Sequence, residues 1–339
     1  MKHCLTLICL LFGSCALGPG EFVRRPEQPV CWPPDSESPR ISVLFSYHDS
    51  ADAEFDSGAL RRFGDWAFGK EIEYLGTPYG LSLLPNQNLV IADTGLGKVH
   101  LLSLLTCQHQ VVPAVAEFPL TTPVGVAAMP SGGFLVSDST SARIGAYHAD
   151  GSFDCVFASH VNFGRPTGMA WDEIGNRLLV LDTTGSRLLV LSAEGELLHV
   201  LGRPGEGPGE FNHPTNLAVG SDGTIYVMDS LNFRVQIFNP DLTPASQFGV
   251  AGSGPGSFSK PKGIAVDSED HIYVVDAMFD NIQVFDIHGN LLLAFARSGS
   301  GFGRLALPSG LFIDSLDRIF VADGGNSRIQ VFQYHSLQP

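Results

Sequence analysis

The sequence has 339 residues, of which 44% are hydrophobic and 16% are charged, and its formal net charge is −15. Nucleic-acid binding draws its affinity from Lys and Arg side chains that neutralise phosphates, so this acidic composition excludes a nucleic acid from the expected partners. The 38 glycines and 22 prolines are typical of an all-β protein with many tight turns.

The first fifteen residues have the features of an export signal. The apolar stretch Leu5–Phe12 is too short to span a bilayer, and it leads into Gly13-Ser14-Cys15. This ending resembles the bacterial lipobox, with Phe12 where leucine is usual. The resemblance implies that Cys15 is lipidated, whereas an ordinary secretory signal is the alternative. We therefore expect an exported protein, anchored at the outer membrane on its periplasmic or cell-surface face by the N-terminal lipid alone, or else secreted.

Two segments separate this signal from the rest of the chain. Residues 16–39 are rich in Pro, Gly and Ser, which predicts a tether. Within residues 40–76, Arg40–Tyr47 has the β-branched and aromatic residues of a strand. Asp56–Gly69 predicts a short helix or a turn-rich connection. Three cysteines follow the signal and allow one disulfide whose pairing the sequence leaves open: Cys31, Cys107 and Cys155.

Residues 77–339 repeat one unit six times. A proline recurs at spacings of 45, 43, 48, 47 and 47 residues: Pro78, Pro123, Pro166, Pro214, Pro261 and Pro308. An aspartate follows each proline by 15 or 16 positions: Asp93, Asp138, Asp182, Asp229, Asp276 and Asp323. Five residues later comes a basic residue or, once, an asparagine: Lys98, Arg143, Arg187, Arg234, Asn281 and Arg328. This period predicts an array of supersecondary units that bury their apolar faces against one another.

Each unit contains four predicted strands. The proline opens the first strand, the aspartate ends the second, the basic residue opens the third, and a glycine turn precedes the fourth. The patterns P-x-G-[IVL]-A, G-x-[IL]-[YF]-V-x-D and N-x-R-[IV]-Q-[VI]-F resemble the NHL repeat over residues 77–332. The linkers Gly202–Phe211 and Gly249–Phe258 fit its glycine-rich connection. The resemblance implies a six-bladed β-propeller of four-stranded antiparallel blades.

The sixth unit lacks a fourth strand after Phe332. An open outer edge would leave backbone groups unpaired at the point where the ring closes. We expect the segment Arg40–Tyr47 to supply this strand by pairing with Arg328–Phe332. Gly58–Gly64 is the alternative.

A feature that recurs in every blade is expected to have a structural role that every blade requires. We therefore interpret the repeated aspartates and basic residues as turn caps and ion pairs, with the Asn281 amide closing the turn in blade five. Function is expected where one blade departs from the others. Asn216 stands where the other five copies have glycine, and His213 directly precedes Pro214. His213 and Asn216 are therefore the candidate channel site.

The metal and catalytic predictions follow from the same comparison of blades. The resemblance extends to secreted lyases that bind zinc through histidines from several blades, and a catalytic zinc needs three protein ligands. The matching positions here offer only His213. We predict no metal ligands, no catalytic residues and no cofactor. A metal-dependent lyase or lactonase-like enzyme with its site at the central channel is the alternative function.

In two blades, apolar residues occupy turn positions that have small, polar residues in most of the other blades. Leu231 and Phe233 in blade four, and Met278 and Phe279 in blade five, form a candidate interaction rim. The alternative is that they pack between neighbouring blades. The expected function is an exported binding or scaffold module that holds a protein or another component of the cell envelope. A purely structural element of an envelope assembly is a third hypothesis.

Overall fold

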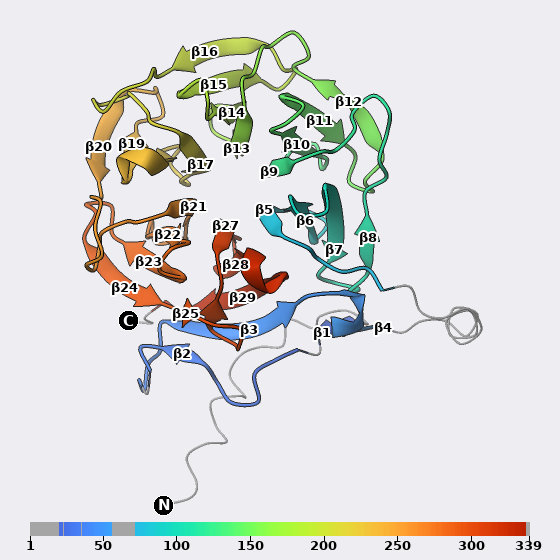
Figure 1. The fold of residues 1–339 in the computed structure, drawn as a ribbon, viewed down its shortest axis with the longest axis vertical. Helices are drawn as coiled ribbons and strands as arrows, with labels where there is room; N and C mark the ends of the chain where they lie inside the picture. The colour runs from blue at the N-terminus through green and yellow to red at the C-terminus, as the bar shows by residue number, and fades with distance from the viewer. Residues whose placement is uncertain (1–19, 23, 35, 56–71, 337–339) are drawn as a thin grey trace, which may run out of the picture.

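The computed structural model describes residues 20–22, 24–34, 36–55 and 72–336. These residues form a ring of six antiparallel blades around a central channel, with the first strand of each blade innermost (Figure 1). The six-bladed propeller of four-stranded blades is confirmed. Cys15, the connection predicted at 56–69 and the alternative closing segment 58–64 lie outside the described residues.

Blades one to five are each a sheet of four consecutive strands, whereas blade six takes its outer strands from the N-terminal segment. The strands of blades one to three are β5 (Pro78–Leu83), β6 (Asn88–Asp93), β7 (Lys98–Ser103), β8 (His109–Val111), β9 (Pro123–Ala128), β10 (Phe134–Asp138), β11 (Arg143–Tyr147), β12 (Phe153–Phe157), β13 (Pro166–Asp172), β14 (Arg177–Asp182), β15 (Arg187–Ser192) and β16 (Leu197–Leu201). The strands of blades four to six are β17 (Pro214–Val219), β18 (Ile225–Asp229), β19 (Arg234–Phe238), β20 (Pro244–Phe248), β21 (Pro261–Val266), β22 (Ile272–Asp276), β23 (Asn281–Phe285), β24 (Leu291–Phe295), β27 (Pro308–Ile313), β28 (Arg318–Asp323), β29 (Arg328–Tyr334) and β3 (Ile41–Tyr47).

The repeated residues mark the ends of strands, as the spacing predicts. The proline is the first residue of each innermost strand, the aspartate is the last of the second, and the residue five later opens the third. In blade five, Pro261 pairs with Asp276, and Asp276 pairs with Asn281 across the next ladder. Proline fits the first position because it has no N–H to give to a ladder. All six prolines and all six aspartates therefore lie on one face of the ring, which we call the proline face.

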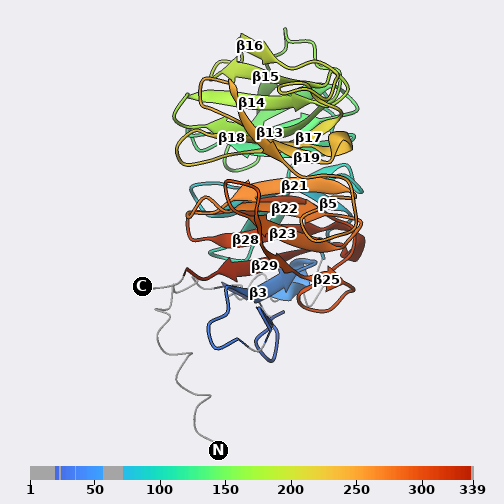
Figure 2. The same cartoon turned by 90° about the vertical axis from the view of Figure 1, so that its left-hand side faces the viewer.

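The N-terminal segment closes the ring. β3 pairs antiparallel with β29, from Ile329 opposite Tyr47 to Tyr334 opposite Ile41. A short strand, β2 (Cys31–Trp32), then adds a fifth strand outside β3. Figures 1 and 2 show β3 lying along the outer edge of blade six. The predicted closing strand is confirmed, and its physical reason is the otherwise open edge of β29.

The hydrophobic core is divided among the blade interfaces. Six clusters of buried side chains each join two neighbouring blades. The cluster at the closure brings Phe45 and Tyr47 of β3 together with Ile91 of blade one and Phe320 of blade six. Both faces of a blade are covered by its neighbours, so the second strands are buried almost continuously instead of alternating, as in β14.

Within the described part of the chain, no disulfide joins Cys31, Cys107 and Cys155. Cys107 is buried and Cys155 is exposed, in blades one and two respectively. The described residues as a whole include no helix with the length and apolar character needed to cross a membrane.

Candidate functional site

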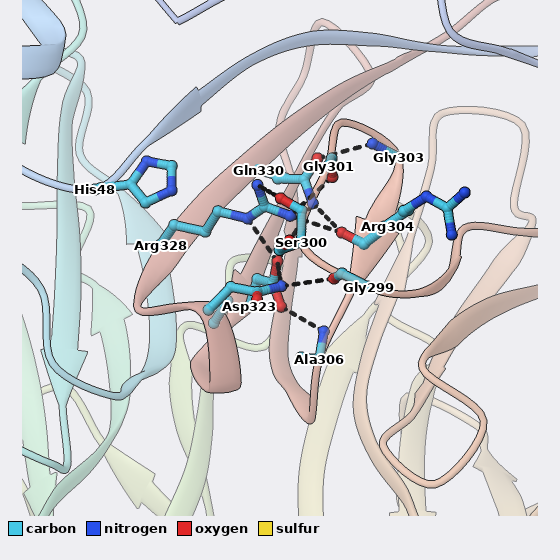
Figure 3. A network of polar contacts seen from close by, with 12 residues as sticks. His48, Gly299, Ser300, Gly301, Gly303, Arg304, Ala306, Asp323, Arg328 and Gln330 are labelled. Carbon is cyan, nitrogen blue, oxygen red and sulfur yellow. Dashed lines mark hydrogen bonds and ion pairs between the residues drawn. The ribbon is translucent and has the colours of Figure 1, made fainter.

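The N-x-R-x-Q segment of blade six holds a glycine-rich connection in place (Figure 3). Arg328 Nε donates to Asp323 Oδ2 at 2.7 Å, and its two terminal nitrogens donate to the carbonyls of Ser300, Gly301 and Arg304. Gln330 also donates to the Arg304 carbonyl. Blade four repeats this arrangement with Arg234 and Gln236. Most N–H donors of these two guanidinium groups are therefore used in structural contacts.

The ion pair is present in some blades only. Asp182, Asp229 and Asp323 pair with Arg187, Arg234 and Arg328. The prediction is wrong for the others. Lys98 and Arg143 are exposed and form no ion pair with any described residue. The side-chain amide of Asn281 forms no hydrogen bond with the Asp276 side chain among those residues, and its Oδ1 is buried without a hydrogen-bond partner in the same set.

Blade one replaces the arginine with a chain of hydrogen-bonded rings. His100 Nε2 lies 3.5 Å from Asp93 Oδ2, and its Nδ1 lies 2.8 Å from Nε2 of His109. His109 Nδ1 in turn lies 2.9 Å from the Tyr47 hydroxyl of β3. Burial, with a further contribution from His100, lowers the pKa of His109 to about 3. Burial alone would raise the pKa of Asp93, but the nearby His100 ring and hydrogen bonds from backbone N–H groups outweigh it and leave a pKa of about 2.

The innermost strands approach one another most closely at the glycine of P-x-G. A Cβ on Gly80 would lie 2.1 Å from the Val124 carbonyl oxygen of the next blade, and a Cβ on Gly310 would lie 1.7 Å from the Tyr79 carbonyl oxygen. Only glycine fits such an approach of two backbones. Asn216 departs from this rule, and its Oδ1 lies 3.0 Å from the position of a Cβ on Gly168 in blade three.

A cavity of about 310 Å³ runs along the six innermost strands. The sixth residue of each of these strands contributes an apolar, half-buried side chain to its wall: Leu83, Ala128, Trp171, Val219, Val266 and Ile313. The lining extends past the glycines to Tyr79 and Thr215 near the proline face, and Glu173 lies at the opposite end. Apolar walls with few polar groups are typical of small-molecule sites.

Near the proline face, a lysine lies over an aromatic ring. Lys262 Nζ is 5.3 Å from the centroid of the Tyr79 ring, which lines the cavity. Burial, followed by the charge of Lys260, lowers the pKa of Lys262. Burial likewise raises the pKa of the Tyr79 hydroxyl, while the charge of Arg165 opposes this rise.

His213 and Asn216 lie in different environments. Asn216 lines the cavity, and its side-chain oxygen accepts a hydrogen bond of 2.8 Å from the Leu217 N–H. His213 is exposed on the proline face, has a left-handed backbone with φ of 54°, and contacts the side chain of Asn212 at 3.0 Å. His213 is not among the residues that line the cavity. The structure therefore does not bring these two residues together in one pocket.

The four residues of the candidate rim divide into two kinds. Leu231 and Met278 are 50% and 62% exposed. Phe233 and Phe279 are half-buried, and Phe233 packs against the core between blades four and five. Leu307, which is 58% exposed, lies beside this region because its N–H donates to Asp280 Oδ1 at 2.7 Å. We call Leu231, Met278 and Leu307 the rim patch.

Comparison with known families agrees with the observed fold. A family model described as a 6-bladed beta-propeller matches residues 170–223 and 219–295, and the NHL repeat model matches residues 305–332. The chain is a six-bladed β-propeller, and its residues 305–332 match the NHL repeat. A search of the curated proteins finds no match.

Several solved propellers share this fold. An auxiliary nutrient binding protein from Bacteroides thetaiotaomicron has a TM-score of 0.61 at 13% identity, covering 79% of this chain and 71% of its own. A gluconolactonase from Xanthomonas campestris has a TM-score of 0.59 at 17% identity, covering 92% and 99%. Virginiamycin B lyase from Staphylococcus aureus has a TM-score of 0.57 at 14% identity, covering 76% and 95%. At these identities the likeness establishes the fold alone.

The propeller channel offers few groups that bind metals. Among the described residues, no three His, Cys, Asp or Glu side chains come together as a ligand set. The described cavity wall contains one carboxylate, Glu173, and no histidine. A three-ligand catalytic zinc site does not fit this donor set.

Sequence reasoning missed the lysine that lies beside the propeller channel. The lysine is found by comparing the second residues of the six innermost strands: Tyr79, Val124, Thr167, Thr215, Lys262 and Ser309. Lys262 is the single charged member of this set, and that contrast could have been seen in the repeat alignment. Its position over the Tyr79 ring could not have been predicted from that alignment, because the contact spans blade six.

Proposed function

We propose that this propeller is a non-catalytic binding module, exported and anchored through Cys15, that holds a protein of the cell envelope against its proline face. The rim patch is the observation that carries the proposal. Blades four, five and six each contribute one exposed apolar side chain at this face, namely Leu231, Met278 and Leu307. Adjacent exposed apolar side chains are typical of the centre of a protein interface.

The backbone at these positions supports a rigid docking surface. Leu231 N–H donates to the Asn212 carbonyl at 3.1 Å, and Leu307 N–H donates to Asp280. Both side chains are therefore presented by turns whose backbone is held in place. A preorganised surface of this kind loses little conformational entropy when a partner binds.

Anchoring at the N-terminus is compatible with an open proline face. The first described residues lie outside the ring, beside blade six (Figure 1). The chain joins the propeller through β3 at the outer edge, not through the channel. A lipid on Cys15 would thus hold the propeller by its periphery, which leaves the face available to a partner.

A metal-dependent lyase or lactonase-like activity is less well supported. Two of the similar solved structures are named as a lyase and a gluconolactonase, which favours this alternative at the level of the fold. The described channel wall, however, provides Glu173 as its one carboxylate. A tightly held stoichiometric zinc or calcium in the purified propeller would overturn the binding-only proposal.

Photo-crosslinking in the native envelope tests the docking face. A photoreactive amino acid at position 278 of the full-length, membrane-anchored protein should capture a discrete partner. Leu231→Ser combined with Leu307→Ser should reduce its yield by roughly tenfold, because two buried apolar contacts contribute about that much to binding. Cys15→Ala should move the propeller from the membrane fraction to the soluble fraction.

Two exposed leucines of the outer strands provide the matched control. Leu198 and Leu292 are 58% and 51% exposed but lie on β16 and β24, at the periphery of the ring. Leu198→Ser combined with Leu292→Ser should leave the crosslink unchanged. Equal crosslinking in the rim-patch variant and in this control would reject the proline face as the docking surface.

A further inference from the structure

A cation lies beside the proline-face end of the channel. Lys262 is not among the residues that line the cavity, but its ammonium group lies over the ring of Tyr79, which does line it. Lys262 is the second residue of β21 in blade five, whereas Tyr79 belongs to β5 in blade one. β27 of blade six lies between these two strands and has Ser309 at the equivalent position, which is buried and small. The lysine side chain therefore reaches past blade six to place Nζ 5.3 Å from the centroid of the Tyr79 ring.

The ammonium group of Lys262 has no counter-ion in the described structure. No described carboxylate lies within ion-pair distance of Nζ, although the chain as a whole carries a net charge of −15. Lys262 is half-buried, and burial of an unpaired charge is unfavourable. The Tyr79 ring offsets part of this cost through a cation–π contact. An anion bound beside the Lys262 ammonium group would offset the remaining cost of its burial.

The remainder of the channel is shaped for an apolar group. Trp171, Val219, Val266 and Ile313 are half-buried and face a cavity of about 310 Å³. From the second to the sixth residue of an innermost strand, four steps of about 3.3 Å span roughly 13 Å. A straight apolar chain of about eight carbons with its head group fits this length.

We propose that the channel binds a small amphipathic monocarboxylate, with its carboxylate at Lys262 and its apolar body along the ring that contains Trp171. The charge distribution sets this orientation. Glu173 lies at the opposite end of the cavity and repels a carboxylate there. The apolar part of this site lies inside the channel and shares no residue with the rim patch, so the site does not depend on the proposed docking of a protein.

Isothermal titration of the full chain with octanoate tests the site, with 1-octanol and octylammonium as probes of the same length. Octanoate should bind more tightly than either. Lys262→Met keeps the length and apolar character of the side chain but removes its charge. This change should weaken octanoate binding by roughly tenfold to a hundredfold, because a charge-assisted hydrogen bond is lost, and should leave octanol binding within about twofold.

Lys98→Met is the matched control, because Lys98 is an exposed lysine at the start of β7, outside the channel. It should leave octanoate binding unchanged, and Lys262→Arg should retain most of it. The emission of Trp171 should shift on titration, and Trp171→Phe should abolish that change while the protein still melts cooperatively. Equal affinity for octylammonium, no octanoate binding at millimolar concentration, or an unchanged affinity in Lys262→Met would each overturn the proposal.

Discussion

Arg328 shows what the repeated basic residue does in a blade. Its side chain is 3% exposed, and its guanidinium joins Asp323 to three backbone carbonyls of the preceding connection. A planar group with five donors suits this task, whereas a lysine does not. In blade five, Asn281 cannot make these bonds, and Gln283 alone still reaches the connection through the Ser257 carbonyl and the Gly256 N–H.

The glycine of P-x-G is required by backbone proximity. Gly310→Ala would place a Cβ 1.7 Å from the Tyr79 carbonyl oxygen, so blades six and one would have to separate. We expect a loss of about 3 kcal/mol in the free energy of unfolding, at the upper end of the cost of overpacking. Urea denaturation followed by circular dichroism measures this.

Gly301→Ala is the control for this substitution. Its Cβ would meet nothing closer than the Arg304 side chain at 3.7 Å, and the backbone φ of Gly301 is not left-handed. The expected change is within about 0.5 kcal/mol. If both alanine variants unfold at the same urea concentration, close approach of the strands does not explain the recurring glycine.

At the scale of elements, closure of the ring depends on β3. This strand covers the edge of β29 and contributes Phe45 and Tyr47 to the core between blades six and one. A chain lacking residues 16–47 should therefore show faster amide exchange in Arg328–Tyr334, because these backbone groups lose their partner strand. Hydrogen exchange followed by mass spectrometry resolves this peptide.

Deletion of residues 16–39 alone gives the comparison. It removes β2 and the contacts of Trp32 with Phe295 and Phe332 but keeps β3 in the chain. Protection of Arg328–Tyr334 should be largely retained in this shorter deletion. The same exchange rates in both deletions would show that β3 does not hold the ring closed.

At the scale of the whole molecule, closure is linked to pH through His109. The folded-state pKa of His109 is about 3, below its ordinary value of about 6.5. The unfolded chain therefore binds a proton that the folded chain does not, so stability is complete above pH 6.5 and falls as the pH decreases toward 3. Between pH 6.5 and 4.5 the expected loss is about 2 kcal/mol from this residue.

His109→Phe should make the fall in stability over this range less steep, even though it removes hydrogen bonds to His100 and Tyr47 at every pH. Urea denaturation at pH 7 and pH 4.5 measures this pH dependence of stability. His288, which is exposed on the turn before β24, serves as the control, and His288→Gln should keep the wild-type slope. An unchanged slope in His109→Phe would remove His109 from the acid response.

Much of the architecture follows from the order of residues along the chain. The recurring proline, glycine and aspartate predict strand ends because they impose local constraints on φ, on hydrogen-bond donors and on turns. The missing outer strand of blade six predicts the role of Arg40–Tyr47 by the same reasoning. These features can be predicted because each of the six units imposes the same local constraints on the backbone.

The positions of functional groups depend on distances between blades. The sequence places Asn216 and His213 three residues apart, yet one lines the cavity and the other is exposed at the face. Lys262 and Tyr79 are far apart in the chain but meet because the ring closes. The repeat therefore determines the blades, whereas closure of the ring determines which side chains share the channel, because that contact requires strands from blades that are not neighbours in sequence.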